Sequence, residues 1–380
     1  METITVMDNK KIPLFTFGTI ILMFLAALGV ISAIYRLVVG LGATTNLSDK
    51  VPWGLWIGMD LSLVALSGCG FTFAALVYIF NFKKYHLVLR RAILMGLLGY
   101  ISFSIILFLE IGRSFRFWHP IVMWQHHSVL FEVTWCVMLY TTVLALEFCP
   151  ILLERFKMSK LIKIIHAVTI PLVMAGIILS TLHQSSLGSL FLILPNKLHP
   201  LWYTSLLPYL FLFSAVMVGI AMVIFESFTS SKIFNIKLNS DIISGLVKFE
   251  VFVLSGYLIF KIIDIVNRGA LPFVFTGGLE SNMFLFEVII GLIIPVVLLF
   301  MSMFKNSSTP IFVSSIMIII GVITNRINVS IIGLMRQSNT VYFPSLIEFF
   351  ITIGVIAGGL LAFRIIVKYF NVFHEVENSE

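Results

Sequence analysis

Long apolar runs recur along the whole chain and are separated by short connections that hold most of the polar residues. A membrane-spanning helix needs roughly 20 apolar residues, and no run shows the alternating pattern of a barrel strand. The pattern therefore predicts an all-α, polytopic bundle of about ten transmembrane helices. Their expected ranges are 13–40, 53–82, 92–112, 128–150, 163–182, 203–227, 246–266, 283–304, 310–332 and 346–368.

The connections are too short to hold a soluble domain, so we expect residues 1–380 to form a single integral membrane domain. The composition agrees, because 59% of the residues are hydrophobic and only 11% are charged. The first segment, METITVMDNKKIPL, has no small-residue cleavage site before the next apolar run. The first helix is therefore expected to stay in the protein.

Basic residues alternate between the two sides of the predicted bundle, so the net charge of +7 indicates topology rather than nucleic-acid binding. One set of connections carries Lys10, Lys11, Lys83, Lys84, Arg90, Arg91, Arg155, Lys157, Lys160, Lys232, Lys237, Lys305 and Lys368. The other set is longer and more aromatic, and carries Lys50, Arg113, Arg116, Lys197, Arg268 and Arg336. The positive-inside rule then predicts that both termini are cytoplasmic and that the long loops face outward.

Most ionisable residues within the runs lie near the predicted outer ends of the helices. They are Asp60, Glu110, Arg113, His126, His127, Glu132, His183, Asp264, Arg268, Glu287, Arg326 and Glu348. A charge within hydrocarbon costs about 2.5–3.5 kcal/mol even on mild scales, so this accumulation needs an explanation. Three remain open: structural pairing or snorkelling at the interface, haem ligation, and a quinone pocket.

Haem ligation by two histidines requires imidazoles on facing helices at matched depth. His127 and His183 are the pair that could meet. The remaining candidates, His86, His119, His166, His199 and His374, lie in loops or near helix ends. The cysteines, Cys69, Cys136 and Cys149, lack CxxC spacing. We therefore expect neither a haem nor a metal of the chain's own.

A quinone pocket explains the polar stretch STLHQSSLGSL, because reduction of a quinone consumes two electrons and two protons, and His or carboxyl groups can deliver the protons. The chain has no dinucleotide fingerprint, P-loop or cysteine cradle. The electrons must therefore come from a partner at the outer face. A secondary transporter, with polar groups near the midplane, and a passive anchor, without carboxylates at depth, are the alternatives from other classes.

Several motifs resemble, in order and spacing, the NrfD-like polysulfide reductase membrane subunits, most closely the HybB-type branch found in periplasmic nickel-iron hydrogenases. They are PWGLWIGMD, YIFNFKKYH, SVLFEV, WCVMLY, LEFCP, LHQSSLGSL, HPLW and YFPS. The resemblance implies two four-helix bundles with flanking helices in a prokaryotic inner membrane. It also implies a haem-free subunit that receives electrons from an extracytoplasmic ferredoxin-like iron-sulfur subunit.

The resemblance further implies a menaquinone-type site whose catalytic residues are Asp60, Glu132 and His183. The expected quinone-binding set adds Glu110, His127, Gln184 and Ser185. The catalytic partner subunit would be a nickel-iron hydrogenase, a molybdopterin enzyme or a multihaem cytochrome. For proton movement from the cytoplasmic side, we expect a path along Glu147, Glu226, Lys261 and Asp264.

Overall fold

The computed structural model describes residues 4–6, 15–194, 197–236, 238–305, 307–338 and 341–376. Lys10, Lys11 and Lys237 lie outside the described residues, as do the side chains of Lys305, Arg336 and His374. Within the described residues, nine helices are long and apolar enough to cross a membrane. The predicted all-helical, polytopic bundle is confirmed.

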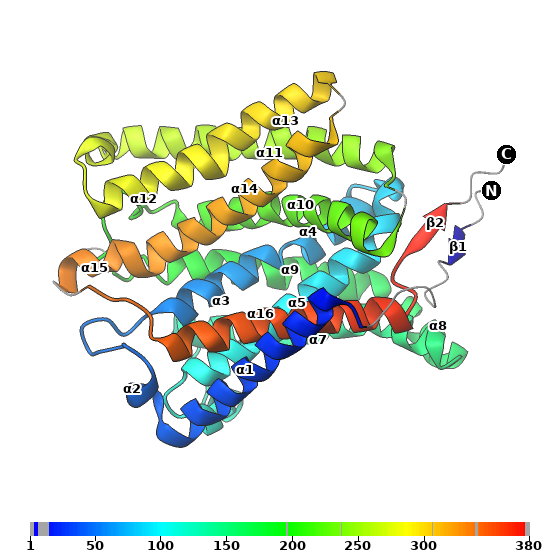
Figure 1. The fold of residues 1–380 in the computed structure, drawn as a ribbon, viewed down its shortest axis with the longest axis horizontal. Coiled ribbons are helices and arrows are strands. Elements are labelled where there is room, and N and C mark those ends of the chain that lie inside the picture. Colours follow the sequence, from blue (N-terminus) through cyan, green and yellow to red (C-terminus); the bar gives the residue numbers. More distant parts are fainter. Residues whose placement is uncertain are drawn as a thin grey trace.

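Both ends of the chain lie at the same end of the bundle, where β1 (Ile4–Val6) pairs antiparallel with β2 (His374–Val376) (Figure 1). A chain whose two ends share one side crosses an even number of times. Helix α11 (Ser240–Asn267) therefore completes ten crossings together with the nine apolar helices of the described chain. We call the end of the bundle that holds β1 and β2 the termini end. The opposite end, where α1, α5, α9 and α11 finish, is called the loop end.

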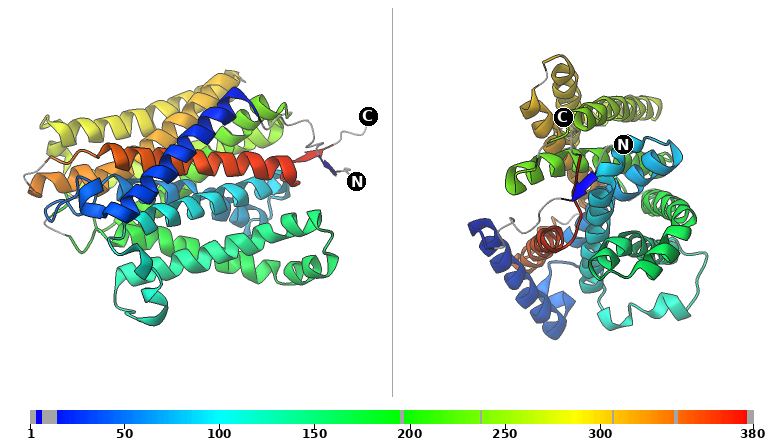
Figure 2. Two further views of the ribbon diagram at one scale, coloured as in Figure 1. Left: turned by 60° about the horizontal axis from the view of Figure 1, so that its bottom comes forward. Right: turned by 90° about the vertical axis from the view of Figure 1, so that its right-hand side faces the viewer.

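The helices form two groups of four and a flanking pair (Figures 1 and 2). The first bundle comprises α3 (Leu55–Leu66) with α4 (Cys69–Ala74) and a π-helical turn (Ala75–Ile79), α5 (His86–Glu110), α7 (Val129–Arg155) and α9 (Thr169–Ser189). The second comprises four spans, of which the first two are α10 (Leu207–Phe234) and α11. The third span joins α12 (Leu279–Val288), a π-helical turn (Ile289–Ile293) and α13 (Ile294–Lys305). The fourth joins α14 (Ser308–Ile327), a π-helical turn (Asn328–Ile332) and α15 (Gly333–Ser338). The flanking pair is α1 (Phe17–Val39) and α16 (Leu346–Tyr369).

Short helical elements occupy the connections. They are α2 (Leu41–Thr44), α6 (His119–Val122), α8 (Ser159–Ala167) and the 3₁₀ turns Lys83–Tyr85, Ser114–Arg116 and Leu271–Phe275. Helix α8 lies at the termini end and buries none of its residues. Its helical period places the apolar Leu161, Ile162 and Ile165 on one face and Lys160 and Lys163 on another. Such a helix is suited to the membrane interface.

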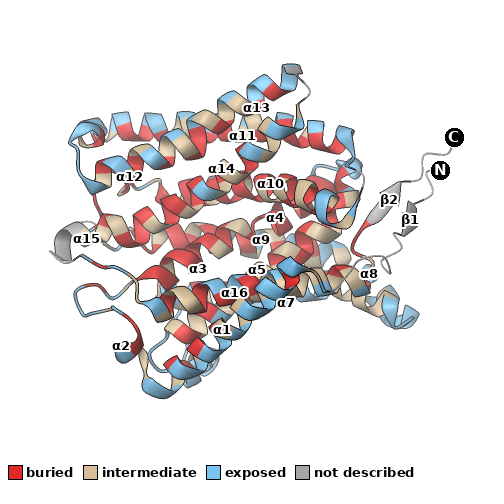
Figure 3. Cartoon of the chain, viewed as in Figure 1, coloured by how far each residue is buried: buried red, intermediate tan, exposed pale blue. Residues whose placement is uncertain are grey.

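Buried residues concentrate in the middle of the bundle, where α3, α4 and α10 meet (Figure 3). Helix α1 differs, because most of its residues, including Phe24, Ile31 and Val38, are exposed. An exposed apolar helix face suits contact with lipid tails. The core therefore lies between the two bundles, and α1 forms part of the outer surface.

Two helix boundaries differ from the sequence prediction in ways that affect the site. The span predicted at 53–82 is interrupted at Ser67 and Gly68, because a Cβ at Gly68 would lie 2.7 Å from the Ala215 carbonyl oxygen of α10. The span predicted at 163–182 begins at Thr169 and continues to Ser189. The polar stretch therefore forms the last turns of α9 rather than a connection after the helix.

Glycines allow the closest helix contacts. A Cβ at Gly29 of α1 would meet the Gly354 Cα of α16 at 2.5 Å, and a Cβ at Gly291 would meet the Gly321 Cα of α14 at 2.5 Å. Small residues at such positions let backbones pack where the bilayer offers no hydrophobic driving force between helices.

We predict that Gly354→Ala destabilises the protein by about 1–3 kcal/mol, because the added methyl group overpacks the contact between α1 and α16. Gly358→Ala on the same helix is the matched control, since nothing lies within 4 Å of a Cβ there. Thermal unfolding of the purified variants measures the difference. Equal melting temperatures for the two variants would contradict this packing argument.

Candidate functional site

A buried histidine with one free nitrogen lies in the first bundle. His183 of α9 is fully buried, and its Nδ1 is 2.8 Å from the hydroxyl of Tyr100 in α5. When that hydroxyl donates to Nδ1, the neutral imidazole carries its proton on Nε2. Nε2 is buried and has no hydrogen-bond partner in the described part of the chain. In that tautomer, His183 presents an unused N–H donor inside the bundle.

Other polar groups surround this histidine. The ring of Tyr140 packs edge-on against Tyr100, with centroids 4.8 Å apart. Gln184 donates its Nε2 to the Val64 carbonyl oxygen of α3 at 2.8 Å, and its buried Oε1 has no partner among the described residues. A free acceptor and a free donor thus occupy successive positions of α9. Polar groups left unpaired in a buried site are costly unless a ligand satisfies them.

Glu132 reaches the same helix from α7. Ser186 donates its hydroxyl to Glu132 Oε1 at 2.6 Å, and Ser186 lies about one helical turn from His183. Glu132 itself is exposed at the loop end. The structure therefore places Glu132 and His183 on one pair of packed helices, with a carboxylate that water can reach.

Two other predicted residues have different surroundings. Ser185 donates its hydroxyl to the Thr181 carbonyl oxygen of its own helix at 2.8 Å. His127 is exposed in the connection before α7, and its ring lies beside that of His126. Neither contact joins these side chains to His183.

Asp60 belongs to a second polar group at the loop end. It is 3% exposed on α3, and its side chain interacts with that of Glu110, the last residue of α5. Asp60 does not share these hydrogen bonds, because His183 is bonded to Tyr100 and Glu132 to Ser186. Both groups nevertheless border α3, because Gln184 contacts that helix one turn beyond Asp60.

Glu348 continues this second group towards the loops. Its Oε1 accepts hydrogen bonds from the Asn46 and Ser345 backbone N–H groups at 3.0 and 3.1 Å, and its Oε2 accepts one from the Tyr342 hydroxyl. Burial and this hydrogen bond raise the pKa of Tyr342 above its ordinary value. Tyr342 therefore remains a donor, and Glu348 forms a capping box with Ser345, the N-cap residue of α16.

The most elaborate buried network lies in the second bundle. Lys261 forms an ion pair with Glu287, and both side chains are almost completely buried. The Glu287 carboxylate also accepts hydrogen bonds from Asn325 at 2.9 Å, Asn328 at 2.8 Å and the Trp202 indole at 3.1 Å. This carboxylate is fully satisfied, as a buried charge must be.

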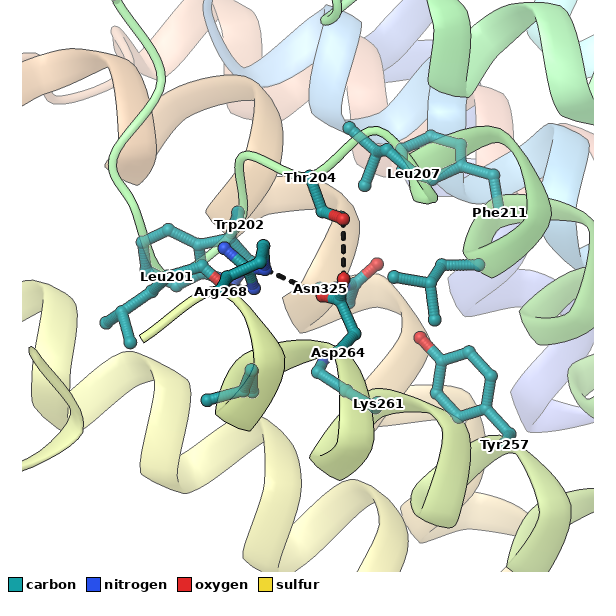
Figure 4. Close-up of a pocket in the computed structure, with 12 residues that line it drawn as sticks. Leu201, Trp202, Thr204, Leu207, Phe211, Tyr257, Lys261, Asp264, Arg268 and Asn325 are labelled. Carbon is teal, nitrogen blue, oxygen red and sulfur yellow. Dashed lines mark hydrogen bonds and ion pairs between the residues drawn. The ribbon is translucent and has the colours of Figure 1, made fainter. Parts of the chain in front are cut away.

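Asp264 and Arg326 extend the network. Asp264 accepts a hydrogen bond from Thr204 at 2.6 Å and pairs with Arg268 at 2.9 Å (Figure 4). Arg326 is 1% exposed, donates to Asn325 and Ser214, and lies 3.6 Å from the ring centroid of Phe211. A cavity of about 10 Å³ borders Asp264, which is about the space for one water molecule.

The four residues predicted for a proton path lie in separate groups. Glu226 pairs with Arg91 at 2.9 Å and accepts a hydrogen bond from Ser230. Glu147 is half-buried on α7. Lys261 and Asp264 lie one turn apart but bind different partners, as described above. The transmembrane path stays a prediction.

Three buried polar residues were not predicted from the sequence: Tyr100, Asn325 and Glu250. Tyr100 and Asn325 lie within apolar helices and gain importance only through contacts across helices. Glu250 carried a signal, because it interrupts the apolar run KFEVFV. It is fully buried on α11, and neither carboxylate oxygen has a hydrogen-bond partner among the described residues.

Comparison with known proteins gives consistent matches. The family model described as polysulphide reductase, NrfD, matches residues 43–338. A protein of Nitratidesulfovibrio vulgaris is 35% identical over 97% of both chains. The probable Ni/Fe-hydrogenase 2 b-type cytochrome subunit of Escherichia coli is 29% identical over 97% of this chain and 94% of its own. The menaquinone reductase integral membrane subunit of Nitratidesulfovibrio vulgaris is 28% identical over 90% and 88%, respectively.

We predict that Lys261→Met destabilises the protein by about 3–5 kcal/mol, because it leaves the Glu287 carboxylate buried without its cation. The double variant Lys261→Met with Glu287→Gln removes both charges and should recover most of that loss. Thermal unfolding of the wild type, both single variants and the double variant gives the coupling energy. Additive effects of the two substitutions would show that the pair contributes no coupling.

Proposed function

The chain belongs to the polysulphide reductase NrfD family, and from this premise we propose that it is the quinone-reactive integral membrane subunit of a respiratory oxidoreductase complex. The names of its relatives support the proposal, since they include a menaquinone reductase integral membrane subunit and an Ni/Fe-hydrogenase 2 cytochrome subunit. We propose more specifically that electrons pass between an extracytoplasmic iron-sulfur partner and the menaquinone pool at the loop end.

The buried Nε2 of His183, which has no hydrogen-bond partner among the described residues, is the observation that carries this proposal. A quinone carbonyl accepts hydrogen bonds and offers no donor, so it complements a buried donor without an acceptor. Reduction adds two electrons, which the partner supplies, and two protons. His183 can pass its Nε2 proton to the carbonyl oxygen while Tyr100 gives its hydroxyl proton to Nδ1 across their 2.8 Å contact, and a proton from the loop end then restores the Tyr100 hydroxyl.

Proton supply from the loop end completes this route. Glu132 is exposed there and is hydrogen-bonded to Ser186, about one turn from His183. Asp60 of α3 and Glu110 of α5 form a pair of carboxyl groups. We assign this pair to proton delivery to the other quinone oxygen. Two adjacent buried carboxyl groups can share a proton, which suits a proton donor.

We further propose that the loop end faces outward and the termini end faces the cytoplasm of a prokaryotic inner membrane. Of the described basic residues, the termini end holds Lys83, Lys84, Arg90, Arg91, Arg155, Lys157, Lys160, Lys163, Lys232 and Lys368. The loop end holds fewer, and its exposed aromatic residues Trp124, Phe275 and Phe343 suit a docking surface. A ferredoxin-like iron-sulfur subunit would dock there and carry a hydrogenase, molybdopterin or multihaem catalytic subunit.

We predict that His183→Gln lowers quinone turnover by about 100-fold or more, because glutamine can donate a hydrogen bond but cannot relay a proton. Quinone-linked activity of the purified complex, with subunit stoichiometry measured in parallel, gives the result. His166→Gln, on the exposed helix α8, is the matched control and should leave turnover unchanged.

Glu132→Gln tests the same route independently. It should reduce turnover sharply while the complex still assembles, because the substitution removes the exposed proton donor next to Ser186. Wild-type turnover in both variants would sink the proposed pocket and favour a structural role for these residues.

We predict that the purified subunit shows no haem absorbance, although one relative is named as a b-type cytochrome subunit. The reason is geometric: the rings packed against His183 are Tyr100 and Phe103, whereas His127 packs beside His126. A stoichiometric Soret band that disappears in a His183→Ala variant would establish haem ligation instead.

A further inference from the structure

An arginine-lined cavity of about 260 Å³ lies at the loop end, apart from the polar groups described above. It is formed by the last turns of α1 and the connection that follows α5. Its lining includes Arg36, Leu37, Arg113, Ser114, Phe115 and Arg116. Three arginine residues therefore line the same cavity.

Arg36 is the deepest of these groups. It is 2% exposed, and a terminal nitrogen donates a hydrogen bond to the Ile111 carbonyl oxygen at 2.9 Å. Its buried Nε has no partner in the described part of the chain. A buried charge without a counter-charge is costly, so a vacant N–H donor on a buried cation points to an anionic ligand.

No carboxylate in the described part of the chain supplies an anion here. None forms an ion pair with Arg36, Arg113 or Arg116, and the four ion pairs among the described residues lie elsewhere. Ser114 donates its hydroxyl to the Ile111 carbonyl oxygen at 2.9 Å and adds no negative charge. The cavity is therefore strongly cationic.

The position of the cavity identifies the source of the anion. Arg36 lies in the last turn of α1, where Tyr35 and Val38 are exposed towards the surroundings of the bundle. Phe115 and Trp118 are exposed beside the cavity, and such aromatic residues mark the depth of lipid headgroups. An anion at this depth, reached from the outer surface of α1, belongs to the membrane.

We propose that this cavity binds the phosphate headgroup of an anionic phospholipid from the leaflet at the loop end. The planar guanidinium groups of arginine match phosphate oxygens in paired hydrogen bonds. The cavity volume is below that of a typical pocket for a whole drug-sized ligand, so it takes the headgroup while the acyl chains lie along the exposed face of α1. The bound lipid links α1 to the segment that follows Glu110.

The test uses the purified full-length chain, or its complex, after removal of native lipid. Short-chain phosphatidylglycerol, short-chain phosphatidylcholine and inorganic phosphate are titrated separately, and bound molecules are counted by native mass spectrometry. We expect one tightly bound phosphatidylglycerol per chain, weaker binding of phosphatidylcholine, and no displacement of the phosphatidylglycerol by millimolar inorganic phosphate.

Variants connect the binding to the cavity. Arg113→Gln with Arg116→Gln should weaken phosphatidylglycerol binding by about tenfold or more, since each cation near the surface contributes appreciably to binding anionic lipid. These exposed residues are changed because removal of the buried Arg36 would also disturb folding. Lys160→Gln with Lys163→Gln removes the same charge from α8 at the termini end and should leave this tight binding unchanged.

Three results would overturn the proposal. They are wild-type affinity in the arginine double variant, equal retention of phosphatidylglycerol and phosphatidylcholine, and displacement of the lipid by inorganic phosphate. The last result would identify free phosphate as the occupant rather than a lipid.

Discussion

The cost of an unmatched charge in hydrocarbon governs how this bundle is organised. Every helix must satisfy its own backbone hydrogen bonds, so only side chains can pair across helices. In the second bundle, the Glu287 carboxylate binds Lys261 and receives three further hydrogen bonds. That network ties α11, α12 and α14 to the connection before α10. Its full satisfaction makes it a structural centre of that bundle.

The surroundings of His183 differ from that network, because they leave buried polar atoms of neighbouring side chains unused. His183 Nε2 and Gln184 Oε1 have no partners among the described residues, although both are buried. Protein interiors rarely tolerate such groups without a reason. Two such atoms on successive residues of α9 are the main structural support for placing the quinone chemistry near His183. The cationic cavity at Arg36 follows the same logic at the membrane surface, where a lipid can supply the missing charge.

Close backbone contacts set the geometry in which these groups meet. Gly29 and Gly354 bring α1 against α16, and Gly291 and Gly321 bring a π-helical turn against α14. A π-helical turn shifts the face on which later residues lie and often marks a functional position. The turn Asn328–Ile332 begins with the residue that donates to Glu287. Packing and polar pairing are therefore coupled in the second bundle.

The sequence alone determined that the chain crosses a membrane, about how often it crosses, and that its polar residues gather at one end. These properties follow from local hydrophobicity, which a single apolar run expresses without its neighbours. The family motifs also pointed to His183 and Glu132, whose helices the structure packs together. The extension of α9 to Ser189 was missed, because small polar residues do not mark where a helix packed against others ends.

Only the tertiary structure decided which groups meet. Lys261 lies one turn from Asp264 in the sequence, yet it pairs with Glu287 of another helix. His183 finds Tyr100 of α5. These choices depend on the rotation and depth of each helix relative to its neighbours. Glycine contacts and interruptions such as that at Gly68 set this register, and a one-dimensional pattern of apolar runs does not contain it.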